Sequence, residues 1–380
     1  MSVFNQLIDQ EHITKILRQA VISAKDDVND SQGMTHAWLF AGPPGSGRSS
    51  AALAFAAALV CPNGGCNECV ECKTAQAGAH ADVELIRTEG LSIKIDEVRE
   101  LIQRASWNPA VANYRVVVME DADRLTESAA NALLKAIEEP GLRTVWLLCA
   151  PTLSDVLPTI RSRTRNLVLR TPSVQAIEEL LLRENTSPGL ASIAARASQG
   201  HIGIARHLAT NEQSRNQRSH NLKLPTTIHD IASAFKAAEL LVNSAKSAAE
   251  AEAELKNEKE LLQLKEAWGQ QGSKLSQGGS KAVKDLEKEQ KSRQTRMIRD
   301  YLDRALLDIA TLYRDILFRQ SESQNGIINS DQMETITNIA NTTTPEQTLA
   351  KLEAIMKART NLNHNAAPLL TIEALMVSLR

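Results

Sequence analysis

The residues most able to do chemistry lie between a short apolar stretch and an alanine-rich stretch near the N-terminus. Glycines let backbone N–H groups approach a phosphate without a Cβ in the way, and a helix that begins there adds its positive end. The pattern predicts a phosphate-binding loop between a strand at 37–41 and a helix that ends near Val60. Its residues are Gly42, Gly45, Gly47, Arg48 and Ser49.

One residue departs from the phosphate-loop pattern. The pattern G-x-x-x-x-G-K-[ST] has a lysine, a compact charge on a flexible stem, where this chain has Arg48 with its wider planar fork. Ser49 stands where a hydroxyl would bind Mg²⁺. We therefore expect a loop that is shaped for a nucleotide and poorly equipped to hydrolyse one. The alternative is a plain glycine-rich turn between a strand and a helix.

Two acidic residues follow a run of β-branched residues. Glu120 and Asp121 come directly after the strand expected at 114–119. In P-loop NTPases the acids at this place support Mg²⁺ and polarise the attacking water, in the order Asp then Glu. The order is reversed here, and the shorter Asp121 has less reach toward a water molecule. The alternative is a charged turn between a strand and a helix.

Four of the five cysteines are clustered. Thiolates two to four residues apart can close on one tetrahedral Zn²⁺, and four sulfurs fill its shell, so the ion would be structural. In a chain with reduced thiols, such spacing favours a metal over disulfides. An Fe–S cluster and four unligated thiols are the alternatives. The cluster consists of Cys61, Cys66, Cys69 and Cys72.

Composition narrows the class of protein. At 380 residues the chain is long enough for two or three domains. Its net charge of −2 argues against a bulk polyanion binder, and its aromatic content of 3% argues against a surface that stacks many bases. We find no signal-peptide pattern and no apolar stretch long enough to cross a bilayer. Together these features indicate a cytoplasmic protein.

Strands and helices are expected to alternate around these motifs, which predicts a parallel sheet covered on both faces. Further along, Arg161, Arg163 and Arg165 are typical of a solvated basic face. A charged stretch near 244–293 predicts a helical hairpin or insertion, with Gly278 and Gly279 between its two arms. The expected strands are 37–41, 83–86, 114–119 and 145–150, and the expected helices include 95–105, 128–138 and the amphipathic 297–317.

The motifs occur in one order that resembles the clamp-loader subunits of bacterial DNA polymerase III, within the AAA+ superfamily. They are Phe4-x-x-Leu-Ile-Asp-Gln10, the phosphate loop, the four cysteines, Glu120-Asp121, Asn131-Ala-Leu-Leu-Lys135 with Glu138-Glu139-Pro140, and Ser162-Arg163. The resemblance is good over about 1–210 and weak beyond. It implies an α/β AAA+ P-loop domain with a parallel sheet at 1–168, which carries a zinc module at 61–72. It also implies a small helical lid domain at 169–210 and an all-α collar domain at 225–380, which holds the charged insertion.

This chain differs from the motor subunits of that family in four places. It has Arg48 for lysine, Glu120-Asp121 for Asp-Glu, Ala150-Pro151 where the motors have a threonine, and Gly200-His201-Ile202-Gly203 for Gly-Ser-x-Arg. Ser162-Arg163, in contrast, matches the family's Ser-Arg-Cys motif, whose arginine reaches the ATP site of the neighbouring subunit. The combination resembles the delta-prime class, an ATPase-deficient stator that supplies an arginine finger.

The resemblance also implies partners and cofactors. We expect motor subunits and a delta subunit in a hetero-pentamer, with the sliding clamp and primed DNA reached through the complex and no membrane partner. ATP and Mg²⁺ would lie at the neighbouring subunit, and Zn²⁺ would be structural. The chain would then be part of a DNA-directed DNA polymerase, a nucleotidyltransferase, without being a competent ATPase itself. Two other hypotheses are an active ATPase motor subunit and a nucleic-acid-binding zinc protein that uses residues 61–72.

Overall fold

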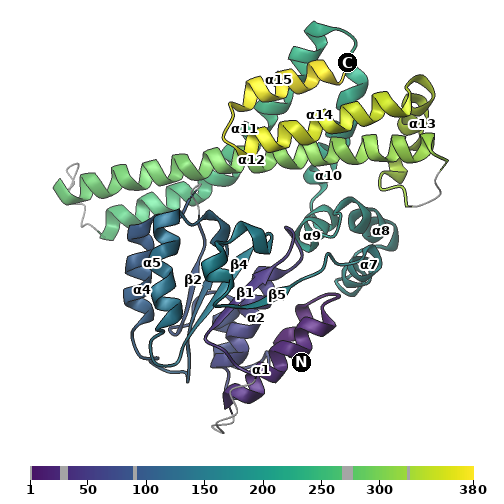
Figure 1. Cartoon of the computed structure of the whole chain (residues 1–380). Coiled ribbons are helices and arrows are strands. Elements are labelled where there is room, and N and C mark those ends of the chain that lie inside the picture. The colour runs from purple at the N-terminus through teal and green to yellow at the C-terminus, as the bar shows by residue number, and fades with distance from the viewer. Residues whose placement is uncertain (1, 26–32, 89–91, 268–276, 323–325) are drawn as a thin grey trace. The chain divides into compact units, whose positions relative to one another are not determined.

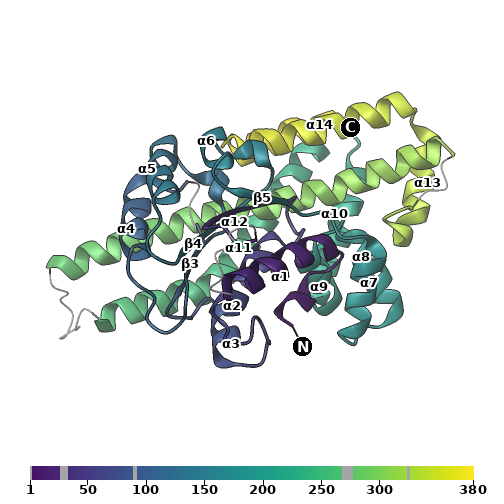
Figure 2. The same ribbon diagram turned by 60° about the horizontal axis from the view of Figure 1, so that its bottom comes forward.

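The computed structural model describes residues 2–25, 33–88, 92–267, 277–322 and 326–380. The chain divides into two compact units, Met1–Ala209 and Thr210–Arg380. The first contains a sheet with helices on it, and the second is helical (Figures 1 and 2). The expected order of an α/β part followed by an all-α part is confirmed.

A five-stranded sheet forms the centre of the first unit. Its order is β2-β3-β4-β1-β5, and every neighbouring pair is parallel. Parallel neighbours need crossover connections, which the intervening helices supply. Four of the strands lie close to the expected positions, and β5 was not predicted. They are β1 Ala37–Ala41, β2 Val83–Ile86, β3 Arg115–Met119, β4 Thr144–Ala150 and β5 Arg165–Val168.

Helices cover both faces of this sheet. Trp38 and Phe40 of β1 belong to the core shared with α1 and α2, whereas Leu39 belongs to the core shared with α4 and α5. This follows from the alternation of side chains along a strand. Alanines make α2 small on every side, so almost the whole helix is buried against the sheet. The helices are α1 Glu11–Lys25, α2 Arg48–Val60, α3 Val70–Gln76, α4 Ile95–Ala105, α5 Glu127–Glu138 and α6 Pro158–Arg161.

A buried carboxylate holds the loop between α4 and β3. Asp82 is fully buried just before β2, and its oxygens accept hydrogen bonds from the backbone N–H groups of Ala110, Val111 and Ala112 at 2.6 to 2.8 Å. Burial acts to raise the pKa of this carboxyl, but the three N–H groups outweigh it and the pKa is lowered. Asp82 therefore stabilises the fold only while it is ionised.

We expect Asp82→Ala to lower the free energy of unfolding by about 3 kcal/mol at pH 7, because three N–H groups lose a charged acceptor. The pKa is lower in the folded state than the unfolded value of about 3.9, so the contribution is present above that pH and is lost as the pH falls through the folded pKa. Urea denaturation at pH 7 and below pH 4 measures both effects. Asp96→Ala, on an exposed face of α4, is the control. Equal midpoints for the parent and Asp82→Ala at pH 7 would contradict this role.

Three short helices complete the first unit. They pack on one another through a small separate core that includes Ile177, Leu181 and Ala205. They fall within 169–210, the range in which the resemblance implies a helical lid, and we refer to them as the lid. They are α7 Val174–Arg183, α8 Pro188–Ala197 and α9 Ile202–Thr210.

The second unit is built on two long helices. α12 contributes Leu302, Leu306 and Ile309 to its core, in agreement with the amphipathic pattern expected at 297–317. Residues 268–276 of the charged segment lie outside the described residues. Gly278 and Gly279 fall in the first turn of α12, so their predicted place between two arms is wrong. The helices are α10 Glu212–Lys223, α11 Ile231–Ala267, α12 Gln277–Gln320, α13 Met333–Thr342, α14 Pro345–Asn363 and α15 Pro368–Ser378.

Candidate functional site

The glycine-rich loop has the conformation that its sequence predicts. It leaves the carboxyl end of β1, where the Gly42 N–H donates to the carbonyl of Ala150 at 3.2 Å, and it ends where α2 begins at Arg48. Gly45 and Gly47 have φ angles of +83° and +88°, in the left-handed region that favours glycine. The strand, loop and helix therefore form the expected anion-binding geometry.

Arg48 does not extend freely from this loop. Its Nη1 donates a hydrogen bond of 2.8 Å to the carbonyl oxygen of Gly42, at the start of the same loop. The Oγ of Ser46 is buried and has no hydrogen-bond partner in the described part of the chain. In a phosphate-binding loop the residue at this position contacts a phosphate, whereas here the Arg48 side chain is hydrogen-bonded to the loop's own backbone. Ser49 lies in the first turn of α2.

The acidic pair lies at the carboxyl end of β3, the edge of the sheet that also carries the loop. Glu120 forms an ion pair with Arg87 at 3.1 Å. The charges of Arg48, Glu120 and Asp121 all act on the thiol of Cys149, which is fully buried in β4 between β1 and β3, and burial raises its pKa. The loop and the two acids are therefore brought together, as expected.

Sequence reasoning missed Asp123 at this edge. Its side chain is largely buried after β3, and its Oδ1 has no hydrogen-bond partner among the described residues. Burial raises the pKa of this carboxyl, the nearby Asp121 raises it further, and the charge of Arg48 lowers it. The adjacent Glu120-Asp121 matched the acid pattern, so the sequence offered no separate signal for a third carboxyl after this strand.

The four clustered cysteines are brought together at the other end of α2. Their Sγ atoms all lie within 4.8 Å of one another, with 3.7 Å between Cys61 and Cys66 and 3.6 Å between Cys61 and Cys69. Two sulfurs on a tetrahedral Zn²⁺ with bonds of about 2.3 Å are about 3.8 Å apart. The cluster could therefore hold zinc.

Backbone N–H groups point at these sulfurs. The N–H groups of Asn63, Cys69 and Cys72 donate to the Sγ atoms of Cys61, Cys66 and Cys69 at 3.3 to 3.4 Å. Such donors favour the thiolate, which is the form that binds a metal. N–H groups of Glu68 and Cys69 lower the pKa of Cys66 to about 6, while burial raises that of Cys69 to about 11.

Arg163 is held at the surface between α6 and β5. Its Nε donates to a carboxylate oxygen of Glu138, and its Nη1 donates to the carbonyl of Thr159 at 3.0 Å. The side chains of Arg163 and Glu138 are 41% and 46% exposed, so the guanidinium remains accessible. Arg165 behaves differently, because it donates to the carbonyl of Gly33 and lies 4.9 Å above the ring of buried Trp38. The expectation that all three arginines form a solvated face is wrong for Arg165.

Arg163 and the glycine-rich loop lie at opposite ends of the parallel strands of the sheet. The loop follows the carboxyl end of β1, whereas Arg163 precedes the amino end of β5, the parallel neighbour of β1. Arg165 pairs with Trp38 and Val168 pairs with Ala41, so the two ends are separated by the length of a four-residue strand, about 13 Å. The loop and the arginine therefore face away from each other within one chain.

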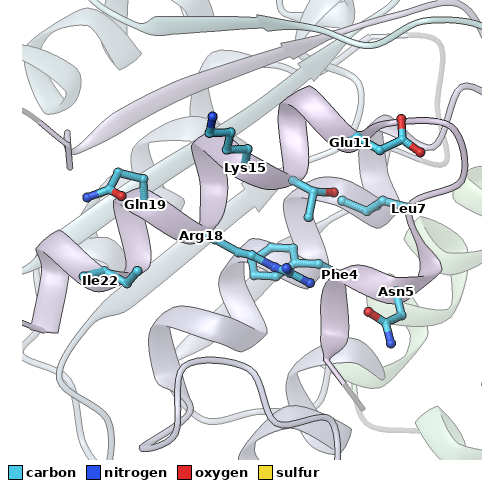
Figure 3. Close-up of a pocket in the computed structure, with 9 residues that line it drawn as sticks. Phe4, Asn5, Leu7, Glu11, Lys15, Arg18, Gln19 and Ile22 are labelled. Atoms are coloured by element: carbon cyan, nitrogen blue, oxygen red, sulfur yellow. The ribbon is translucent and has the colours of Figure 1, made fainter.

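An open groove of about 460 Å³ lies along α1 (Figure 3). The guanidinium of Arg18 lies over the ring of Phe4 in it, 6.0 Å from the ring centroid. None of the candidate residues described above lines this groove. Within the part of the chain that the structure describes, no helix is both long enough and apolar enough to cross a membrane.

Two family models match the chain. The model for "DNA polymerase III, delta subunit" matches residues 17–173, and the model for "DNA polymerase III, delta subunit, C terminal" matches residues 300–379. The first spans the sheet, the cysteine cluster and the glycine-rich loop. The second spans most of the helices that follow the charged segment.

Curated relatives match about half of the chain. DNA polymerase III subunit delta′ of Bacillus subtilis is 32% identical over 199 residues, which cover 52% of this chain and 60% of the relative. DNA polymerase III subunit tau of the same organism is 34% identical over 179 residues, or 46% of this chain and 30% of the relative. Among solved structures, a gamma subunit-related protein from Thermotoga maritima aligns over 97% of this chain and 98% of its own, at 17% identity and a TM-score of 0.41.

Proposed function

The chain belongs to the delta-prime family of DNA polymerase III subunits, and we propose that it is an ATPase-deficient clamp-loader subunit that supplies Arg163 to a neighbouring ATP site. It would assemble in the cytoplasm with motor subunits and a delta subunit in a hetero-pentamer. That complex would load the sliding clamp onto primed DNA. The aligned part of the chain spans 60% of the delta′ relative and 30% of the tau relative, so the partners belong to the proposal.

The position of Arg163 carries this proposal. A guanidinium at the amino edge of a parallel sheet cannot reach a phosphate bound at the carboxyl edge of the same sheet, about 13 Å away. It is exposed and oriented by Thr159, and among the described residues its ion pair is with the surface carboxylate of Glu138, so a phosphate from another chain could replace Glu138. Arginine is suited to this task because it stabilises the charge that develops on a transferring phosphoryl group.

The chain's own loop supports the second half of the proposal. The lysine of an intact loop reaches the β- and γ-phosphates, but here Arg48 donates to the Gly42 carbonyl. A planar guanidinium does not substitute for a flexible ammonium at such a point. The acids Glu120 and Asp121 stand in reversed order, and Glu120 is paired with Arg87. We therefore assign ATP and Mg²⁺ to the neighbouring subunit's site.

The cysteine cluster completes the proposed assignment. A Zn²⁺ bound by Cys61, Cys66, Cys69 and Cys72 would have four sulfur ligands and no open position. Its role would be structural, because catalysis at zinc needs a free coordination site. It would fix the segment 61–72 against the end of α2.

The purified chain alone is expected to show no ATP turnover above background, because Arg48, the cation of its loop, is bonded to the Gly42 carbonyl. Mixed with the motor subunits, it should raise turnover at the site that it completes by about 10³-fold or more. Steady-state phosphate release, measured for each subunit alone and for the mixture, tests both statements. Turnover by the isolated chain that disappears in Asp121→Asn would overturn the proposal.

That outcome would instead favour an active motor subunit. Two observations support this second candidate: the similarity to the tau relative, and the retained left-handed glycines of the loop. The motor hypothesis requires Arg48 to leave the Gly42 carbonyl when a nucleotide binds. Measurement of nucleotide affinity for the isolated chain separates the two candidates.

A further inference from the structure

The segment that connects β5 to the lid helices is fastened to the N-terminal segment. The buried amide of Gln10 makes two hydrogen bonds to the backbone of Arg170, donating at 2.6 Å and accepting at 3.2 Å. Next to it, Asp9 has a φ angle of 60°, and its carboxylate accepts from the N–H of Ser173 at 2.9 Å. Three hydrogen bonds within four residues thus hold the start of the lid.

A second fastening lies at the glycine-rich loop itself. A Cβ on Gly45 would lie 2.2 Å from Cγ and 2.4 Å from Cα of His201, so the histidine is in direct contact with the loop. The N–H of Ile202 approaches the carbonyl of Gly45 at 3.5 Å. A phosphate-binding loop works by close approach of the ligand to its glycines, so a residue packed on Gly45 closes one side of the loop.

The position of the imidazole is set by its own helix. Nδ1 of His201 accepts the N–H of Ile204 at 3.2 Å and so caps the N-terminus of α9. A Cβ on Gly203 would lie 3.3 Å from Cε1 of the ring, closer than most Cβ contacts. Gly203 thus leaves room for the imidazole, and a larger residue at this position would crowd it.

We infer that the lid of this chain is latched to the sheet by its own side chains, with His201 on Gly45 as the latch and Gln10 and Asp9 as the fixed end. The inference rests on the proposed function, because a stator needs no opening and closing at its own loop. It deepens that proposal, because it attributes the loss of nucleotide binding at the glycine-rich loop to a contact from the lid as well as to Arg48.

His201→Ser tests the latch, because serine keeps a side-chain acceptor at the cap while it removes the ring from Gly45. Amide hydrogen exchange of the full-length chain is expected to rise at least tenfold in residues 42–47 and 200–206, with the rest of the sheet unchanged. In the parent chain, ATP with Mg²⁺ should leave exchange in both segments unaltered. His207→Ala, at an exposed position of α9, is the matched control and should leave exchange as in the parent.

Binding of a fluorescent ATP analogue supplies an independent measurement. Arg48→Lys combined with His201→Ser should bind it at least tenfold more tightly than Arg48→Lys alone. Equal affinity of these two variants, or unchanged exchange in His201→Ser, would overturn the latch. Neither outcome touches the proposed function, which depends on Arg163 in the assembled complex and fails only in the turnover experiment. A parent chain that binds the analogue tightly would also overturn the latch, whereas the ATPase deficiency would fall only if that chain turned ATP over.

Discussion

Arg163→Ala is expected to lower ATP turnover at the neighbouring site by about 10³-fold or more, because arginine fingers contribute a factor of this size. The fold should survive the change. Arg163 lies at the surface and forms an ion pair with the exposed Glu138, and such pairs contribute less than about 1 kcal/mol. The measurement is single-turnover phosphate release by a reconstituted complex, with assembly followed by gel filtration.

Two controls separate the guanidinium from its surroundings. Glu138→Ala removes the surface ion pair and keeps Arg163, so turnover should be retained. Arg161→Ala removes a neighbouring arginine at the end of α6 and should also leave turnover unchanged. Undiminished turnover by a complex that contains Arg163→Ala would show that the arginine does not act in trans, whatever the state of the chain's own loop.

Loss of the cysteine cluster is expected to have the largest effect on stability. Cys72→Ser should abolish binding of about one Zn²⁺ per chain and lower the free energy of unfolding by more than about 4 kcal/mol, since loss of a structural metal belongs to the most destabilising changes. Cys61 and Cys72 are both buried, so their side chains cannot rearrange toward solvent. Elemental analysis and thermal unfolding with and without a chelator measure the two effects.

Cys149→Ala is the matched control for this experiment. Cys149 is the fifth thiol of the chain and is buried in β4, apart from the cluster. Its replacement should leave the metal content unchanged. A parent chain that contains no zinc, and whose unfolding does not respond to a chelator, would show that the cluster is four unligated thiols. Iron and sulfide in place of zinc would support the Fe–S alternative.

Much of the first unit could be predicted because its signals are local. The strand at 37–41 and the helix at 95–105 are confirmed at both ends, since continuous apolar residues and a strong helical period mark them. The loop and the cysteine cluster were predictable for the same reason. Both depend on residue types at short, fixed spacings, which a sequence displays directly.

The contacts that could not be predicted join residues far apart in the sequence. The carboxylate of Asp82 is held by a loop about thirty residues later, and Gln10 is bonded to Arg170 after 160 residues. Each involves a polar side chain and a backbone group, so no residue type marks the partner. His201 likewise packs against Gly45, which lies far earlier in the sequence.

The common direction of the strands has a consequence for assembly. When an arginine lies at one end of the parallel strands and a phosphate-binding loop lies at the other end, contacts between such subunits are head to tail. Head-to-tail contacts build an open row or a ring and exclude a two-fold dimer. In such an arrangement, a subunit whose own loop binds no nucleotide can supply an arginine to one neighbour's ATP site. It has no ATP site of its own for another subunit's arginine to reach. If Arg163 acts on a neighbouring ATP site as we propose, the parallel orientation of β1 and β5 would put this chain at one end of such an assembly.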